Sequence, residues 1–201
     1  MWLSLGATFF PSPQQRPIPA DAAIVLAIRI FDGTAEVTAE TRVHVYPAGT
    51  RGEPLAADFL EGLGHQVPVT PGIYDVQAVQ QREGEVVNIR WVERLVVMRY
   101  PHEAGTHLEV INFQPGFGAL QVLPPPESPP SQNGWQVTAF LVRAQAPDPI
   151  NPVASEVYYL FVVPGGDYDL LARGGSAPVW LTDIEVPPDH TRLKHLPTPA
   201  R

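Results

Sequence analysis

Apolar residues in this chain occur in short runs of β-strand length, with turn residues between them. The clearest run, AIVLAIRIFDG, begins at Ala23 and closes with Asp32 and Gly33. A continuous apolar run that ends in turn residues is typical of a buried strand. Further along, Val43 and Val45 alternate with polar neighbours, which is the period of a strand with one buried face. The pattern therefore predicts a protein rich in β-strands.

One segment has a helical spacing instead. Leu55, Phe59, Leu60 and Leu63 occupy positions i, i+4, i+5 and i+8, and Gly64 follows them. This spacing gathers apolar side chains on one side of a helix, and glycine commonly ends a helix. The sequence predicts one or two turns of amphipathic helix here and no other helix.

A β-hairpin is predicted after Pro71-Gly72. Proline fixes φ and glycine tolerates positive φ, so the pair favours a turn, and the strand IYDVQAVQQ follows it. The chain turns again at 82–85 (REGE) and returns as VVNIRWVERLVVM. We expect Ile89, Trp91 and Val92 of the returning strand to contribute to the core.

The C-terminal half contains a similar hairpin. Pro164-Gly165 precedes Tyr168-Asp169, just as a Pro-Gly pair precedes Tyr74-Asp75, and a glycine-rich turn then leads to a strand with a tryptophan. The tyrosines are 94 residues apart, and Trp91 and Trp180 are 89 residues apart. Four features in the same order favour an internal repeat, which marks a duplicated unit.

The repeat sets the expected domain organisation. We expect an all-β protein made of two tandem Greek-key-like β-sandwich domains, residues 23–117 and 118–201, after a lead segment 1–22. The lead segment begins with the apolar stretch MWLSLGATFF, either a signal-peptide remnant or a first edge strand. The proline-rich stretch 123–134 is expected to be a surface loop whose role stays open. The link near Gly116 is too short to be a free tether, so the domains should share an interface.

Composition supports strands and narrows the choice of partners. The 24 prolines argue against long helices, because proline removes a backbone donor and clashes with the preceding turn. The formal net charge of −8 disfavours nucleic acid and anionic membranes. The chain has no cysteine, so disulfides and thiolate metal sites are excluded, and no apolar run is long enough to span a membrane.

The histidines His102 and His107, with Glu103, are the first candidate metal site. A zinc protease places two histidines at i and i+4 of a helix, so that both imidazoles lie on one side. Here the spacing is five, and Gly105 favours a turn. We expect solvated loop residues and no metal.

Two aspartates are the second candidate. Asp167 and Asp169 flank Tyr168 and should point to the same side of a strand, where paired carboxylates can hold calcium. The obvious additional oxygen ligands are Asp148 and Asn151. Aspartates at turns and strand ends usually serve the local backbone, which is the interpretation we favour. The serines show no G-x-S-x-G pattern, and no catalytic, cofactor-binding or metal-ligating residue is predicted.

The aromatic residues leave two interpretations open. Because Tyr74, Trp91, Tyr168 and Trp180 recur in both halves, we expect them to fill equivalent core or sheet positions. The alternative function, a small-ligand or carbohydrate-binding module with or without calcium, requires an exposed platform. That platform would be formed by Trp135, Tyr158 or Tyr159.

The motifs resemble a known class of bacterial domains. The stretches VTPGIYDVQA, IRWVERLVV and FGALQV, and later VVPGGDYDLLA and VWLTDIEV, are similar to carboxypeptidase-regulatory-like and PEGA-type domains, whose sandwich is similar to transthyretin. The resemblance covers roughly Ile24 to Leu196. It implies a non-enzymatic structural or protein-interaction module of the bacterial cell envelope or periplasm, with another protein as partner. The oligomeric state stays open.

Overall fold

The chain folds into β-sheets, which confirms the predicted fold class. The computed structural model describes residues 24–55, 58–60, 64–99, 105–125, 136–141, 149–155, 158–173 and 178–197, with the backbone alone at 58–60 and 136–141. In this part of the chain the one helical element is a 3₁₀ turn, η1 (Thr38–Glu40). The lead segment 1–22 and most of the loop 123–134 lie outside the described residues.

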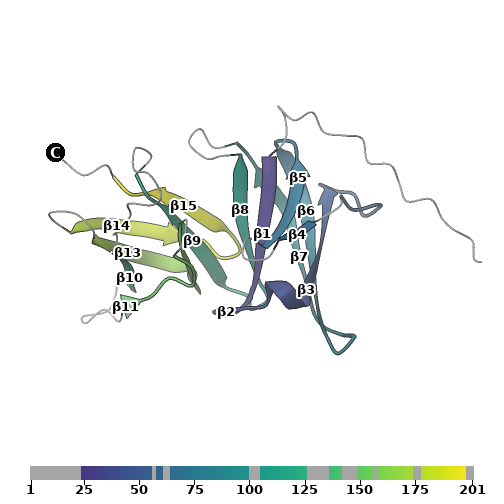
Figure 1. Ribbon diagram of the computed structural model, residues 1–201, viewed down its shortest axis with the longest axis horizontal. Coiled ribbons are helices and arrows are strands. Elements are labelled where there is room, and N and C mark those ends of the chain that lie inside the picture. Colours follow the sequence, from purple (N-terminus) through teal and green to yellow (C-terminus); the bar gives the residue numbers. More distant parts are fainter. Residues whose placement is uncertain are drawn as a thin grey trace, which may run out of the picture.

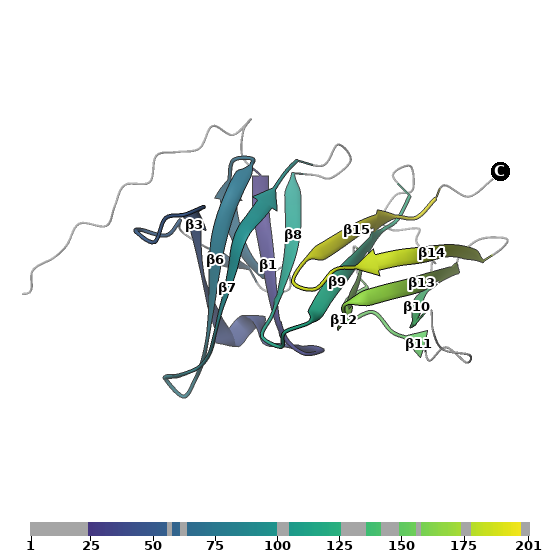
Figure 2. The same ribbon diagram turned by 180° about the vertical axis from the view of Figure 1, so that it is seen from behind.

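The N-terminal sandwich contains two facing sheets (Figures 1 and 2). Sheet A is built around β1 (Ile24–Asp32), which pairs with β2 (Ala35–Glu36), β5 (Gly64–Val69) and, in parallel, β8 (Thr106–Asn112); β4 (Asp58–Leu60) extends it beyond β5. Sheet B has the antiparallel order β3 (Thr41–Pro47), β6 (Gly72–Arg82), β7 (Glu85–Val97).

The C-terminal sandwich follows the same plan. Sheet C has β9 (Phe117–Leu123) between β12 (Tyr159–Pro164), which is antiparallel to it, and β15 (Thr191–His195), which is parallel to it. Sheet D has the order β11 (Pro149–Ile150), β10 (Gln136–Leu141), β13 (Gly166–Arg173), β14 (Val179–Val186).

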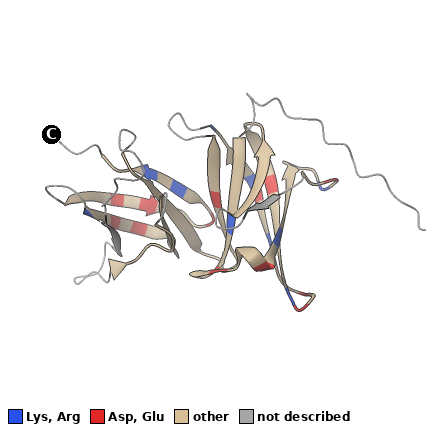
Figure 3. Cartoon of the chain, viewed as in Figure 1, with Lys and Arg blue, Asp and Glu red and all other residues tan. Residues whose placement is uncertain are grey.

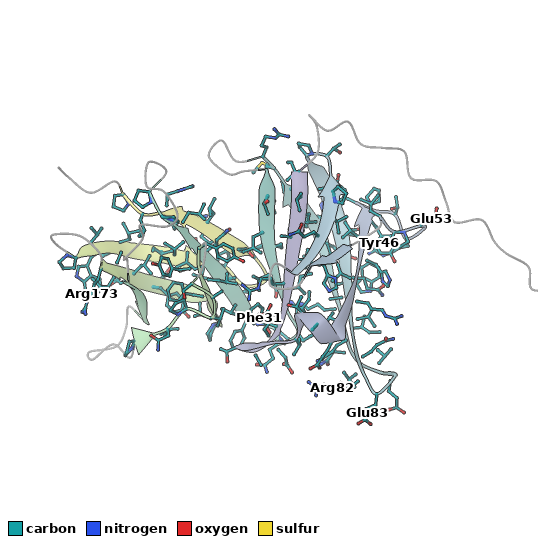
Figure 4. The ribbon with its side chains drawn as sticks, in the orientation of Figure 1. Phe31, Tyr46, Glu53, Arg82, Glu83 and Arg173 are labelled. Atoms are coloured by element: carbon teal, nitrogen blue, oxygen red, sulfur yellow. The ribbon has the colours of Figure 1, made fainter. Side chains whose placement is uncertain are left out.

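Three apolar clusters connect the sheets in the order B, A, C, D. One cluster joins sheets A and B, and a second joins sheets C and D. The third lies between sheets A and C and holds the two sandwiches together; its buried members are Ala27, Phe31, Leu108, Val110, Ala119, Leu160 and Val162. Phe31 lies between the two sandwiches in Figure 4. The predicted contact between the two halves is therefore present.

The position of β1 explains its continuous apolar run. Leu26 and Ile28 point toward sheet B, whereas Ala27 and Phe31 point toward sheet C. A strand that is covered on both faces favours apolar residues on both, because neither face reaches water, and the buried Arg29 of β1 forms an ion pair with Glu36. Strands β9 and β12 are covered in the same way, and their burial patterns are almost uninterrupted.

Polar contacts supplement the cluster between the sandwiches. Arg90 of β7 forms an ion pair with Asp189 in the β14–β15 turn. Glu109 of β8 accepts hydrogen bonds from the backbone amide and the hydroxyl of Thr191, both at 3.0 Å. The bonds between Glu109 and Thr191 connect β8, at the edge of sheet A, to β15 of sheet C. The two sandwiches therefore meet through specific polar groups as well as through apolar packing.

The predicted helix at Leu55 to Leu63 is wrong where the structure describes it. Asp58–Leu60 is strand β4, which pairs with β5, and Leu55 bridges to Val45 of β3. A helix of one or two turns forms too few hydrogen bonds to offset its nucleation cost, whereas the edge of β5 offers backbone partners at once. Gly64 makes this turn possible, because it has a φ of +82° and a Cβ there would lie 2.3 Å from the Ile28 carbonyl oxygen.

Candidate interaction surface

A β-bulge in the β6–β7 hairpin is built around Asp75. The pairing of Tyr74 with Leu95 and of Val76 with Val92 leaves two residues of β7 opposite this single aspartate. One of them, Arg94, has a φ of +59°, and its backbone amide donates to Asp75 Oδ1 at 2.8 Å. The carboxylate thus supports a backbone conformation that non-glycine residues rarely adopt.

Asp75 also holds the loop that follows β3. The Gly49 amide donates to its Oδ2 at 2.9 Å, and the Arg51 guanidinium donates to the same oxygen at 2.7 Å. The amide of Arg94, then that of Gly49 and the Arg51 side chain, lower the pKa of Asp75 from its ordinary 3.8 to about 2. Because both carboxylate oxygens accept bonds from the protein, Asp75 has a structural role.

The same arrangement occurs at the Tyr-Asp pair of the second hairpin. Tyr168 pairs with Ile184 and Leu170 with Leu181, and Asp183, with a φ of +57°, donates its amide to Asp169 Oδ1 at 3.2 Å. Each tyrosine hydroxyl donates to the carbonyl four residues earlier, Tyr74 to Thr70 at 2.7 Å and Tyr168 to Pro164 at 2.5 Å. The Tyr-Asp motif therefore supplies a tyrosine corner and a support for the bulge.

An aromatic and cationic stack lies on the outer side of sheet B. The Arg51 guanidinium lies 4.1 Å from the centroid of the Trp91 ring, and the Tyr46 and Trp91 centroids are 5.7 Å apart. Arg51 also forms an ion pair with Glu93 at 2.8 Å. Figure 4 shows Tyr46 on the side of sheet B that faces away from sheet A. Because Arg51 and Tyr46 both contact the Trp91 ring, this indole is not an open stacking platform.

A shallow pocket lies beside this stack. Its volume is about 290 Å³, and it is lined by Ala48, Gly49, Arg51, Asp75, Glu93 and Arg94. The charges of the two arginines and the two carboxylates balance, and the Asp75 oxygens are occupied by protein donors. The pocket carries no free nucleophile or base for catalysis among these residues.

The outer side of the β6–β7 hairpin exposes apolar side chains, and we call it the β6–β7 face. Cross-strand partners lie on the same side of a sheet, so Ile73 adjoins Val96, and Val79 adjoins Ile89. Ile73, Val96 and Ile89 are 43%, 49% and 57% exposed. The further exposed apolar residues of this hairpin and its end are Val86, Val87 and Met98. The charged bulge at Asp75 lies between the Ile73–Val96 pair and the Val79–Ile89 pair, so this face has an apolar pair on each side of the bulge.

The outer side of the β13–β14 hairpin is acidic at the matching positions. Asp167 is paired with Glu185, where the first hairpin has Ile73 paired with Val96. The charged residues of β13 and β14 are four acids and one arginine, whereas β6 and β7 carry three acids and three arginines. The acidic bands on β13 and β14 are visible in Figure 3. Two carboxylates of the second hairpin therefore replace the exposed Ile73–Val96 pair of the first, although the second hairpin exposes Trp180.

The structure corrects part of the predicted core. Tyr74 and Tyr168 are buried, as expected, and so is Val92. Trp180, which is 51% exposed, and the half-buried Trp91 occupy matching sheet positions outside the core, and the prediction that Ile89 lies in the core is wrong. The sequence VVNIRWVERLVV has apolar residues at both even and odd positions, so its alternation does not show which side faces the core.

The predicted metal candidates are not gathered into a site by the described residues. His102 and Glu103 lie outside those residues, and His107 is buried on β8, where its Nε2 is 3.6 Å from Glu109 Oε2. Asp148 also lies outside them, and Asp169 is bonded to the Asp183 amide. No group of three or more potential metal ligands occurs in the part of the chain that the structure describes.

The aromatic residues named for a sugar platform have other roles where they can be placed. Tyr159 is buried in the cluster between sheets C and D. Tyr158 packs at the interface between the sandwiches, and its hydroxyl accepts a hydrogen bond from Arg29 Nη1 at 3.3 Å. Trp135 lies outside the described residues. Neither tyrosine forms an exposed platform.

The sequence alone predicted neither the exposed apolar residues of the β6–β7 face nor the charged groups at the Asp75 bulge. The signal that was available is the contrast between matched positions, since Ile73 and Val96 correspond to Asp167 and Glu185 after the two Tyr-Asp pairs are aligned. The role of Arg51 had no local signal. It arises from a loop that the fold brings against Trp91 and Asp75.

Comparisons with known proteins give distant structural neighbours. No family model matches the chain, and no curated protein matches it. A candidate adhesin of Bacteroides ovatus ATCC 8483 has 12% identity and a TM-score of 0.34, covering 96% of this chain and 100% of its own. GBS52, the minor pilin of Streptococcus agalactiae, has 12% identity and a TM-score of 0.27, covering 89% and 98%. The Bacillus anthracis TIE protein has 12% identity and a TM-score of 0.28, covering 86% of this chain, which spans 33% of that protein.

No helix of the described residues is long and apolar enough to cross a membrane.

Proposed function

We propose that this chain is a non-enzymatic protein-interaction module that docks its partner on the β6–β7 face. One observation carries the proposal: Ile73, Ile89 and Val96 are each exposed by more than two fifths on a single hairpin. Folding leaves these side chains in water, although burying a large apolar side chain stabilises a protein by about 1.5–3 kcal/mol. A protein partner would remove this surface from water.

The surroundings of the face favour protein over sugar as the partner. A sugar-binding site needs an aromatic ring with an open side and nearby polar groups with free hydrogen-bonding capacity. The Trp91 ring is covered by Arg51 and Tyr46, and both oxygens of Asp75 are engaged. Branched aliphatic residues on a sheet surface instead suit the side chains of another protein.

The domain organisation supports a modular role. We propose that each sandwich is a domain, because each has its own apolar cluster, with the boundary in the link 113–116 between β8 and β9. This boundary is close to the sequence-based limit between residues 117 and 118. We further propose, on the resemblance to carboxypeptidase-regulatory-like and PEGA-type domains, that the module works outside the cytoplasm, in the envelope or periplasm.

Site-specific photo-cross-linking in the cells that produce the chain tests the docking face. Benzoylphenylalanine replaces Ile73 in one variant and Asp167, its counterpart on β13, in the control. We expect a discrete protein adduct from position 73 and none from position 167. Adding Val96→Glu beside the cross-linker should remove the adduct, because a buried unpaired charge opposes docking. Equal labelling from both positions, or none from position 73, would overturn the proposal.

A further inference from the structure

We infer that the two sandwiches bear tension, applied along the chain between the segment before β1 and the segment after β15. In each sandwich the first strand runs parallel to the last, β1 beside β8 and β9 beside β15. A pull on the start of the first strand and the end of the last therefore acts along both strands and slides one past the other. All the hydrogen bonds between the two strands then resist the pull together. The inference goes beyond docking on the β6–β7 face and does not depend on it.

The ladder between β1 and β8 covers the whole of β8. Seven residue pairs join the two strands. The Val25 amide extends the ladder at one end by donating to the Gly105 carbonyl at 2.8 Å. The Phe113 amide extends it at the other end by donating to the Phe31 carbonyl, also at 2.8 Å. On its other side β1 is held by five pairs with β5, so a slide of β1 has to break two ladders at once.

The side chains of β1 also oppose sliding. Leu26 and Ile28 pack toward sheet B, and Ala27 and Phe31 pack toward sheet C, and none of the four is more than 3% exposed. A slide by one residue, about 3.3 Å, would bring the side chains of one face to the positions of the other. Close-packed interiors do not accommodate such a change gradually. We therefore expect β1 to hold its position until it is released in a single step.

The C-terminal sandwich repeats this arrangement with β15. Five residue pairs join β15 to β9, and the Leu196 amide extends the ladder by donating to the Leu123 carbonyl at 2.9 Å. The start of β15 is also fixed to the N-terminal sandwich, because the Thr191 hydroxyl accepts a hydrogen bond from the Val110 amide at 2.8 Å. From this point β15 runs away from the N-terminal sandwich (Figures 1 and 2). A pull on its far end therefore acts along the strand.

The two ladders are expected to differ in strength. Strand β1 lies between two neighbours in sheet A, whereas β15 lies at the edge of sheet C beside β9. The ladder of β15 also has fewer residue pairs, five against seven. The C-terminal sandwich should therefore yield first. The load passes through sheets A and C, so the hairpins of sheets B and D lie outside its direct path, and the β6–β7 face stays intact while tension is borne.

Single-molecule force measurements on the full chain test the inference by comparing two directions of pull. The chain has no cysteine, so one introduced thiol can carry a handle opposite a handle at the N-terminus. In Pro115→Cys, beyond the end of β8, the pull slides β8 along β1; in Thr106→Cys, at the start of β8, it opens the same ladder one pair at a time. Both residues are exposed. We expect Pro115→Cys to unfold at a force at least about twice that of Thr106→Cys, because its hydrogen bonds are loaded together.

The wild-type chain, pulled by its two termini, gives an independent measurement. We expect residues 117–195 to be released before residues 24–112, with fully extended lengths of about 280 Å and about 320 Å that identify the two sandwiches. Each release should follow a movement of no more than about 3.3 Å, because a slide of one residue breaks the whole ladder.

Two results would overturn the inference. Equal unfolding forces for Pro115→Cys and Thr106→Cys would show that the direction of the pull does not matter. A wild-type chain that lengthens gradually under load would show that the ladders open one bond at a time. Circular dichroism checks that both variants keep the wild-type fold, and the wild-type measurement decides the question without any substitution.

Discussion

The two hairpins β6–β7 and β13–β14 share one backbone plan and differ on their outer sides. Each has a tyrosine hydroxyl bonded to the carbonyl four residues earlier, an aspartate bonded to the amide of a positive-φ residue, and a tryptophan paired three positions after the tyrosine. These shared features fix the backbone. The two hairpins differ at one outer pair, which is Ile73 and Val96 in the first and Asp167 and Glu185 in the second. These side chains do not determine the backbone, but they determine whether the outer side is apolar or acidic at that position.

The common plan extends to the order of strand pairing. In each sandwich the first strand pairs in parallel with the last, as β1 does with β8 and β9 does with β15. In the other sheet of each sandwich the first strand of the hairpin pairs with an earlier strand of the same sheet, as β6 does with β3 and β13 does with β10. This agreement supports the duplication inferred from the sequence, which stays a prediction. It also makes each position of one hairpin a natural control for the other.

The largest expected effect comes from the layer between the sandwiches. Phe31 is fully buried between sheets A and C, so Phe31→Ala should lower the free energy of unfolding by about 3–5 kcal/mol. Because this side chain couples the two halves, calorimetry should also show the unfolding transition broaden or split. Ile30→Ala, which points into the core of sheets A and B, serves as the control and should destabilise the protein without separating the halves.

The tyrosine corners should be equivalent. Tyr74→Phe and Tyr168→Phe each remove one hydroxyl and leave a carbonyl without its donor, which should cost about 1–2 kcal/mol in each case. Urea denaturation of both variants measures the two values. A loss confined to one of them would show that the corners have different roles.

The two aspartates should differ. Asp75 accepts three hydrogen bonds and Asp169 one, so Asp75→Asn should destabilise the protein more than Asp169→Asn. The pKa of Asp75 is lowered to about 2, so its contribution is complete above about pH 4 and is lost as the pH falls toward 2. The free energy of unfolding measured from pH 5 to pH 2 should therefore fall less steeply in Asp75→Asn than in the wild type.

A smaller pH effect is expected from a buried histidine of the N-terminal sandwich. Burial lowers the pKa of His65 below its ordinary 6.5, whereas bonds to the Thr41 and Thr38 backbone oppose the shift. A depressed histidine pKa means that the unfolded chain binds more protons, so stability decreases as the pH falls below 6.5. Thermal melts between pH 7 and pH 5 should show this decrease in the wild type and a weaker one in His65→Gln.

The sequence was sufficient for features that depend on local pattern. The apolar run of β1, the Pro-Gly turn before β6 and the order of features around Tyr74 and Tyr168 each correspond to observed strands and turns. The helix predicted at Leu55 to Leu63 failed because the free edge of β5 outcompetes a short helix. The outer position of Ile89 and Trp91 depends on which side of β7 meets sheet A, and an apolar strand does not encode that choice locally.

Thiol labelling at matched positions is the most direct test of docking on the β6–β7 face. The natural chain has no cysteine, so Val96→Cys and Glu185→Cys each introduce a single thiol at corresponding exposed positions of β7 and β14. In the cells that produce the chain we expect a thiol reagent to label Val96→Cys at least about ten times more slowly than Glu185→Cys, because a docked partner covers only the first thiol. Equal labelling rates for the two variants, or slower labelling at position 185, would contradict docking on the β6–β7 face.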